Sequence, residues 1–339
     1  MRRVMVWWGG AVLLLLIAGL WVLDRLGDLE LPDADITHHQ LETGGVRLAG
    51  TLVLPRGRPD APVAIIVHGD GPQDRWSGAG YLPLVNALTE RGIGVFSWDK
   101  PGVGESGGDW LDQSMEDRAA SAVAVFRYLS TAVGIAPERL GYLGFSQAGW
   151  VVPQAAGQVE PAFTVLIGVA VNLRLQGLYY TTRRREREGV PRGEISAQAQ
   201  ANLTESDAVF AAGGSAAVPE GMSPERAAFV RRIYGADAAA DIGAMRGPLL
   251  AIWGAEDLNV DPEPNAARYR MLVPDATVQV VPRATHSLLD AGRYNYQLVE
   301  QWPLSAQVAF ALSGREAYAP GVLDRITDWI GAQVTPGGR

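Results

Sequence analysis

Residues 144–149 combine a serine with the small neighbours that a sharp strand-to-helix turn requires. Their sequence is Gly-Phe-Ser-Gln-Ala-Gly, which follows an apolar run at residues 139–143 and precedes a helix-like stretch. Such a turn lifts the serine hydroxyl out of a sheet and directs the next backbone N–H at a developing oxyanion. Ser146 is therefore a candidate nucleophile, and Gln147 a candidate oxyanion donor. With 40 glycines in the chain, the pattern alone also fits an ordinary loop serine.

Two titratable side chains further along the chain each follow a strand-like run. Asp257 comes just after the apolar run at residues 248–254, and His286 follows the run at residues 276–281. Side chains that follow parallel strands gather at the carboxyl edge of the sheet. His286 is thus the candidate base for Ser146, and Asp257 the candidate acid that orients it. The chain order of the three triad residues differs from one serine-hydrolase fold to another, and here it is Ser, Asp, His.

A fourth segment supplies a candidate for the second oxyanion donor. The apolar run at residues 63–67 opens into His68-Gly69-Asp70-Gly71, a glycine-rich loop after a buried strand. The donor in such a loop would be the backbone N–H of Asp70 or Gly71.

With these residues the chain resembles α/β-hydrolases of the serine esterase and prolyl-oligopeptidase-like branch. The resemblance runs from about Leu41 to the C-terminus, and it includes segments 45–55, 68–75 and 98–107. It implies a mainly parallel sheet with helices on both faces and a Ser-His-Asp triad. Asp99, the rival for the acid, falls in a segment that is a structural loop in this family, so Asp257 is preferred. The chain departs from the family pattern at Ala148, where glycine is usual, and at Asp70, where a small residue is usual.

Composition indicates one catalytic domain and excludes several kinds of site. A chain of 339 residues with 47% hydrophobic residues can bury one full core. The net charge of −8 argues against a nucleic-acid partner, which needs a cationic surface. The absence of cysteine removes thiol nucleophiles, and the four histidines lack ligand-like spacing, so we expect neither a metal nor a cofactor.

The N-terminal region predicts a membrane anchor. Residues 4–23 are almost uninterruptedly apolar, about the ~20 residues that a spanning helix needs. Arg2 and Arg3 precede this run and acidic residues follow it, which places the N-terminus in the cytoplasm and the catalytic domain outside the cytoplasmic membrane. A cleaved signal peptide, giving a secreted or periplasmic enzyme, is the alternative. We assign residues 1–30 to this anchor and 31–339 to the hydrolase domain, with no strand before about His38.

Helical patterns replace the strand pattern between residues 172 and 246, which predicts a cap insertion over the site. Ser223 is its clearest helix N-cap, and Pro224 follows at the first helical position. The charged run at residues 183–188 fits either a solvated helix face or a site for a substrate carboxylate, and the solvated face is preferred. Tyr179 and Tyr180 are candidate pocket residues, whereas Trp150 is expected in the core. A second insertion, 288–320, precedes a closing helix at residues 322–334.

These residues predict a serine hydrolase that cleaves carboxylic esters through an acyl-enzyme intermediate. A peptidase or amidase with the same triad is the runner-up, although a chain of this length has no room for the N-terminal propeller of prolyl oligopeptidases. Thioester hydrolysis or acyl transfer is a further alternative. A membrane-tethered binding protein without catalysis is the remaining class, and the ordered triad argues against it.

Overall fold

The structure is a computed structural model that describes residues 25–334. It is built around an eight-stranded sheet. The strand order is β1-β2-β4-β3-β5-β6-β7-β8. The β1–β2 and β2–β4 pairs are antiparallel, whereas the pairs from β4 through β8 are parallel. The predicted mainly parallel sheet is therefore confirmed. The strands are β1 (Ala34–Thr43), β2 (Val46–Pro55), β3 (Val63–Val67), β4 (Gly94–Trp98), β5 (Leu140–Phe145), β6 (Thr164–Ile167), β7 (Leu249–Gly254) and β8 (Thr277–Val281).

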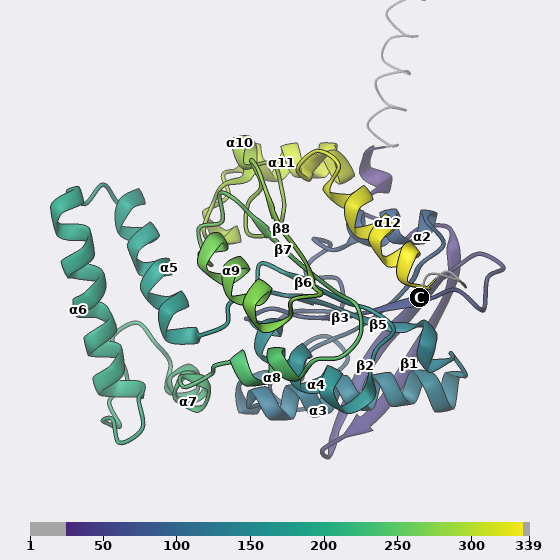
Figure 1. The fold of residues 1–339 in the computed structure, drawn as a ribbon, viewed down its shortest axis with the longest axis horizontal. Coiled ribbons are helices and arrows are strands. Elements are labelled where there is room, and N and C mark those ends of the chain that lie inside the picture. Colours follow the sequence, from purple (N-terminus) through teal and green to yellow (C-terminus); the bar gives the residue numbers. More distant parts are fainter. Residues whose placement is uncertain (1–24, 335–339) are drawn as a thin grey trace, which may run out of the picture.

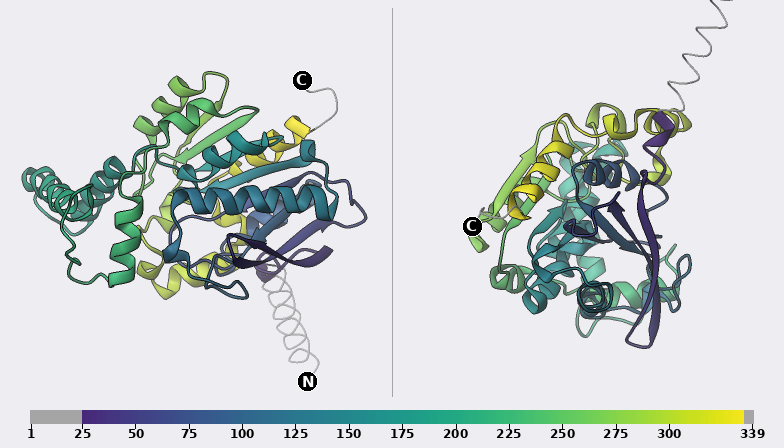
Figure 2. Two further views of the ribbon diagram at one scale, coloured as in Figure 1. Left: turned by 90° about the horizontal axis from the view of Figure 1, so that it is seen from below. Right: turned by 90° about the vertical axis from the view of Figure 1, so that its right-hand side faces the viewer.

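Helices cover both faces of the sheet (Figures 1 and 2). Strand β3 is apolar throughout because both of its faces are buried. Ile65 packs into one core layer and Ile66 into the other. A strand buried on both faces has no solvent side, so the alternation of polar and apolar residues disappears. One layer is formed by α3 (Met115–Tyr128), α4 (Val152–Val159) and α9 (Pro262–Leu272), and the other by α2 (Leu82–Glu90) and α12 (Val322–Val334).

The opening hairpin is longer than its sequence pattern indicates. Strand β1 begins at Ala34, before the predicted limit near His38, and pairs with β2 along its whole length. The hairpin turns at Gly44 and Gly45, whose φ angles of 58° and 76° favour glycine. Much of β1 is exposed at the sheet edge and polar, so its first residues give no hydrophobic signal.

Helices α5 (Leu173–Arg187), α6 (Arg192–Phe210), α7 (Pro224–Ile233) and α8 (Ala239–Ala244) lie between β6 and β7, within the range predicted for the cap. We call residues 173–244 the insertion. Figure 1 shows α5 and α6 projecting from the sheet at the left of the molecule. Helix α7 begins as predicted, because Ser223 Oγ accepts the Arg226 N–H at 3.1 Å and Pro224 is the first helical residue. The second insertion contains α10 (Ala291–Tyr294) and α11 (Leu304–Ser313).

The segment at residues 25–30 is fastened to the body of the protein. Arg25 pairs with Glu316 at 2.6 Å, and Asp28 pairs with Arg315 at 2.8 Å. Asn86 of α2 donates to the backbone oxygen of Glu30 at 2.9 Å. The end of the region that the sequence assigns to the anchor therefore contacts both α2 and the stretch before α12.

The membrane prediction requires correction. The predicted anchor, residues 4–23, lies outside the described residues, and no helix between residues 25 and 334 is long and apolar enough to cross a bilayer. The longest described helix, α6, has 19 residues but carries Glu194, Glu205 and Asp207, which a hydrocarbon layer would not accept. The predicted transmembrane signal anchor, the membrane partner and the cytoplasmic-membrane location are wrong by this finding.

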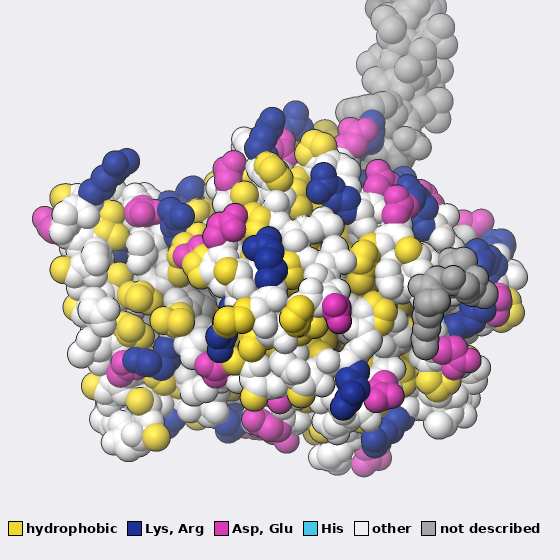
Figure 3. Space-filling view, viewed as in Figure 1, with side chains coloured by type: hydrophobic (Ala, Val, Ile, Leu, Met, Phe, Trp, Pro, Cys, Tyr) yellow, Lys and Arg dark blue, Asp and Glu magenta, His cyan; other side chains and the backbone are white. Residues whose placement is uncertain are grey.

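Charged side chains of both signs are interspersed over the face of the molecule shown in Figure 3. No continuous Lys and Arg patch of the kind that binds a phosphate backbone is present on that face.

Two buried tyrosines offer a matched test of this core. Tyr142 and Tyr269 are both 0% exposed, but Tyr142 donates to the Ala122 oxygen at 3.0 Å whereas the Tyr269 hydroxyl has no partner among the described residues. We expect Tyr142→Phe to lower the free energy of unfolding by about 1 kcal/mol and Tyr269→Phe to leave it unchanged or raise it. Urea unfolding of both variants measures the difference, and equal losses would contradict this assignment of hydrogen bonds.

Candidate active site

Ser146 lies at the sharp turn that follows β5. Its φ of 50° lies in the left-handed backbone region, which residues other than glycine rarely adopt. A 3₁₀ turn, Ser146–Trp150, connects it to α4. A Cβ placed on Gly144 would lie 3.0 Å from the Ala148 Cβ. The turn thus needs glycine at position 144, while the extra methyl of Ala148, a departure from the family pattern, fits because Gly144 has no side chain.

The structure brings His286 and Asp257 together. His286 Nδ1 and Asp257 Oδ2 are 2.7 Å apart, and the Asp257 side chain is 0% exposed. The other carboxylate oxygen accepts the N–H groups of Asn259 at 2.7 Å and Val260 at 2.9 Å. The carboxylate is therefore fixed, and it engages Nδ1 so that Nε2 is the nitrogen left for proton exchange.

Glycines after the two strands that flank β5 let the loops approach each other. A Cβ on Gly69, after β3, would lie 3.3 Å from the Ser146 Cβ. Gly168, after β6, has a φ of 60°, and a Cβ there would lie 2.9 Å from His286 Nδ1. No side chain fits at Gly168 without moving the imidazole.

Asp99 is occupied elsewhere. Its carboxylate accepts the backbone N–H of Arg75 at 2.8 Å, the Arg75 side chain at 2.5 Å and the N–H of Glu105 at 2.9 Å. Burial opposes ionisation, but Arg75 and these N–H groups hold the pKa of Asp99 below its ordinary value. The carboxylate organises the loop after β4, which agrees with the preference for Asp257.

Two buried cations hold the backbone of the loop after β3. Lys100 Nζ donates to the carbonyl oxygens of Gly69 and Gly71, both at 2.8 Å, and Arg118 Nη2 donates to the His68 oxygen at 2.6 Å. Burial lowers the pKa of His68 to about 3, so its imidazole is neutral and adds no charge. The carbonyl groups around Asp70 are thus fixed by side chains beneath the loop.

The side chains of the two candidate oxyanion residues belong to the same network. Gln147 Nε2 donates to Asp70 Oδ1 at 3.2 Å, and Gln147 Oε1 accepts from Arg118. Arg226 of α7 donates to Asp70 Oδ1 at 2.9 Å and also contacts Oδ2. Burial would raise the pKa of Asp70, but Arg226, followed by Lys100, keeps it below its ordinary value. Asp70 is therefore ionised beside the candidate oxyanion donors.

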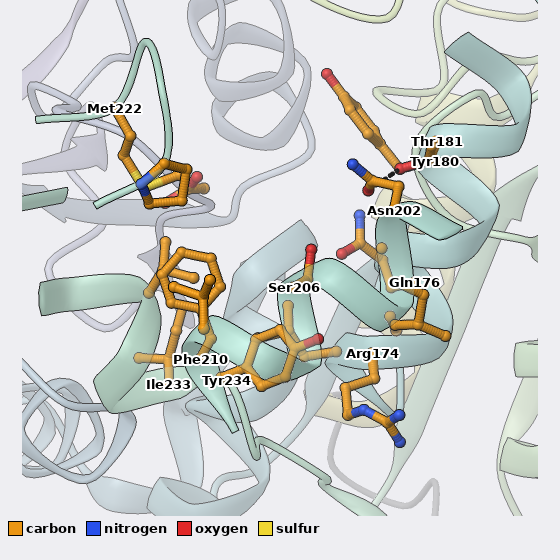
Figure 4. A pocket seen from close by; sticks show the side chains of 18 of the residues that line it. Arg174, Gln176, Tyr180, Thr181, Asn202, Ser206, Phe210, Met222, Ile233 and Tyr234 are labelled. Carbon is orange, nitrogen blue, oxygen red and sulfur yellow. Dashed lines mark hydrogen bonds between the residues drawn. The ribbon is translucent and has the colours of Figure 1, made fainter. Parts of the chain in front are cut away.

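A cavity of about 590 Å³ opens between this edge of the sheet and the insertion. Ser146, Gln147 and Asp70 contribute to its wall. Figure 4 shows that the rest of the wall has two ends. Apolar side chains lie on one side of the view, and they include Phe210, Met222 and Ile233. Polar side chains lie on the other side together with the charged Arg174, and they include Gln176, Thr181 and Asn202; Ser206 lies between the two sides.

The tyrosines predicted to line the pocket have different positions. Tyr180 lines the cavity, whereas the Tyr179 hydroxyl donates to the Asp257 backbone oxygen at 2.7 Å. Trp150 is buried as expected and also contributes to the cavity wall.

The charged run at residues 183–188 is mainly a solvated helix face. Arg183 pairs with Glu186 and Arg185 with Glu188, each at 2.8 Å, and all four side chains are partly exposed. Arg184 is the member of this run that lines the cavity.

Sequence reasoning missed several residues that support the site. Lys100 had a local signal, since it directly follows Asp99 at the end of β4 and is the only lysine of the chain. Arg118 and Arg226 lie within helices and outside any motif, so nothing in their sequence context indicates the loop that they contact. Gln297 is 4% exposed and donates to the backbone oxygens of Tyr180 and Leu258. It ties the second insertion to α5 and to the loop after β7.

Comparison with known proteins identifies the family on sequence. A family model described as serine aminopeptidase, S33, matches residues 59–291, which is more than half of the chain. The uncharacterized protein YfhR of Salmonella typhimurium is 36% identical over 101 residues, which are 30% of this chain and 33% of that protein. YfhR of Escherichia coli K12 is 34% identical over 106 residues, 31% and 36% of the two chains. This chain thus matches about a third of the length of these curated relatives.

Solved structures confirm the α/β-hydrolase fold. Est1E of Butyrivibrio proteoclasticus, solved with ferulic acid, matches with a TM-score of 0.56 and 14% identity over 86% of this chain and 96% of that one. The esterase Pf2001 of Pyrococcus furiosus gives 0.55 and 16%, covering 86% and 94%. Proline iminopeptidase of Mycobacterium smegmatis gives 0.53 and 17%, covering 88% and 99%.

Because Lys100 is the only lysine, its titration can be followed without assignment. Burial and then the charge of Arg118 lower the pKa of Lys100 well below its ordinary value, against the opposing effect of Asp70. We expect the single NMR signal of protein labelled with ¹³C at lysine Cε to titrate well below the usual ~10.4. Arg118→Met should raise this midpoint. A midpoint at or above the ordinary value would contradict the burial of this amine.

Proposed function

The chain belongs to the α/β-hydrolase family described as serine aminopeptidase, S33, and is a serine hydrolase; we propose that it cleaves carboxylic esters with Ser146, His286 and Asp257. The observation that carries this proposal is the strained elbow at Ser146, which lines the cavity, and the His286–Asp257 pair, formed on loops after two other strands of the same sheet, supports it. The nucleophile elbow and the oriented base are the two parts that acyl transfer by serine requires.

The residue types define the mechanism. His286 removes the proton of Ser146 as the hydroxyl oxygen attacks the ester carbonyl, and Asp257 stabilises the imidazolium. Collapse of the tetrahedral intermediate transfers that proton to the departing alcohol and leaves Ser146 acylated. Water, deprotonated by His286, then attacks the acyl carbon, and the carboxylic acid leaves as Ser146 regains its proton.

The negative oxygen of the intermediate needs donors that are fixed in advance. We assign this role to the backbone N–H of Gln147 and to that of Asp70 or Gly71. The hydrogen bond from Lys100 to the Gly69 carbonyl supports the assignment, because the peptide plane of that carbonyl also carries the Asp70 N–H. The second hydrogen bond, to the Gly71 carbonyl, holds the far side of the same loop.

The cavity favours a neutral ester with an apolar group. Arg174 is paired with Asp207, and Arg226 with Asp70, so the positive charges nearest the polar wall and the oxyanion loop have counter-charges. The apolar end around Phe210 would take a hydrocarbon portion of the substrate.

Aminoacyl amide hydrolysis is the second candidate. Glu205 and Glu220 both line the cavity. A carboxylate facing the cavity could pair with the free ammonium group of an aminoacyl substrate, in keeping with the description of the family.

A substrate panel separates the two candidates. We expect the enzyme to hydrolyse nitrophenyl esters of increasing acyl length, with kcat/KM for aminoacyl nitroanilides at least about 100-fold lower, because the apolar end contributes to ester binding. Ser146→Ala should abolish both ester hydrolysis and labelling by a fluorophosphonate while leaving the melting temperature close to that of the wild type. The opposite substrate ranking, lost on Glu205→Gln, would favour the aminopeptidase, and full activity of Ser146→Ala would overturn the triad.

The acid is tested by a pair of isosteric variants. Asp257→Asn should lower kcat by about 10⁴-fold, because the amide cannot hold the imidazole in the required tautomer. Asp99→Asn should cost far less in kcat, although it should lower the melting temperature by weakening the contacts with Arg75 and Glu105. If the kinetic ranking were reversed, the orienting acid would come from the loop after β4.

A further inference from the structure

The insertion reaches the oxyanion loop through one ion pair. Arg226, in the first turn of α7, contacts both carboxylate oxygens of Asp70, and the side chains are 32% and 42% exposed. Two aromatic rings fix the guanidinium: it lies 5.4 Å from the Trp110 ring centre and 5.0 Å from that of Phe229. The contacts with these rings and with the carboxylate together hold the guanidinium beside Asp70.

Asp70 itself is a problem for catalysis unless its charge is compensated. It is flanked by Gly69 and Gly71, and its carboxylate also accepts a hydrogen bond from Gln147. Negative charge at this point lies beside both residues proposed to donate to the oxyanion. An unpaired carboxylate there would oppose the negative charge that develops on the oxyanion in the transition state.

Other charges near Asp70 do not replace Arg226. Lys100 and Arg118 both raise the local positive potential, but they donate hydrogen bonds to backbone oxygens and to Gln147. Neither side chain forms a hydrogen bond with the Asp70 carboxylate. Arg226 is the side chain that pairs with both of its oxygens.

We propose, on the basis of the proposed ester hydrolysis, that Arg226 is a positioning residue that neutralises Asp70 and holds the oxyanion loop, so that the insertion completes the catalytic site. Arg226 acts through Asp70 and does not react with the substrate. The insertion therefore has a role in the chemical step as well as in forming the cavity wall. Arg226 also lines the cavity, so its effect on turnover must be separated from any effect on substrate binding by comparing kcat with KM.

The decisive experiment is a double-mutant cycle on the full chain. Arg226→Gln should lower kcat for a nitrophenyl ester by about 100-fold, the scale of losing one oxyanion donor, because it leaves an uncompensated carboxylate beside the donors. KM should change by less than about 3-fold, since the effect is on the transition state. Combining Arg226→Gln with Asp70→Asn removes both charges and should restore kcat to within about 10-fold of the wild type.

A purely structural contact gives a different pattern. If the pair served only to dock α7, the double variant would be at least as impaired as either single variant, and that result would overturn the proposal. Arg226→Lys keeps the charge and should lie between the wild type and Arg226→Gln. Arg91→Gln is the matched control, because Arg91 pairs with Asp324 and Asp328 between α2 and α12, and it should keep wild-type kcat.

Two further measurements keep the outcomes distinct. Melting temperatures of all variants show whether a loss of kcat is a loss of folded protein. Fluorophosphonate labelling of Ser146 reports the nucleophile independently of the ester. If the wild type neither labels nor hydrolyses esters, the proposed function fails; if it does both and Arg226→Gln matches it in kcat, the proposed role of Arg226 alone fails.

Discussion

The approach of several loops at the carboxyl edge of the parallel sheet is the constraint on which the rest of the structure depends. Strands β3, β5, β6 and β7 are neighbours, so the residues that follow them meet without long connections. That crowding leaves no room for a side chain at Gly168, and it sets the turn at Ser146 in a strained conformation. The two buried core layers hold the strands rigidly enough to maintain this strain.

Backbone carbonyl groups at such a crowded edge need hydrogen-bond donors. In this protein, buried Lys and Arg side chains donate to several of these carbonyl oxygens. Lys100 and Arg118 satisfy carbonyl oxygens from beneath the loop after β3, where water has little access. The positive charge gathered there is balanced by Asp70, which the insertion approaches from the other side. An acidic residue in this loop, unusual for the fold, is therefore part of a local charge balance.

The sequence predicted features that depend on short-range pattern. Continuous apolar residues indicate buried strands, and the small neighbours of Ser146 indicate the elbow. The sheet and the chain order of the candidate triad could therefore be predicted from the sequence. The side chains that hold the loop around Asp70 were not predicted, because Arg118 and Arg226 are distant in sequence from that loop. The periodicity of a helix carries no information on which group a side chain contacts. The first residues of β1 were not predicted as a strand, because they are exposed and show no alternation of apolar residues. The membrane prediction rested on the apolar length and flanking charges of residues 4–23, outside the described part of the chain, and no helix within that part could span a bilayer.

The ends of the described chain lie away from the insertion. Figure 1 shows the helical turn at Arg25 beside the second insertion and the end of α12 on the right, while α5 and α6 project to the left. The ion pairs of Arg25 and Asp28 fix the first of these ends to the body. A carrier joined at residue 25 or at residue 334 would thus begin on a part of the surface that lies away from α5 and α6.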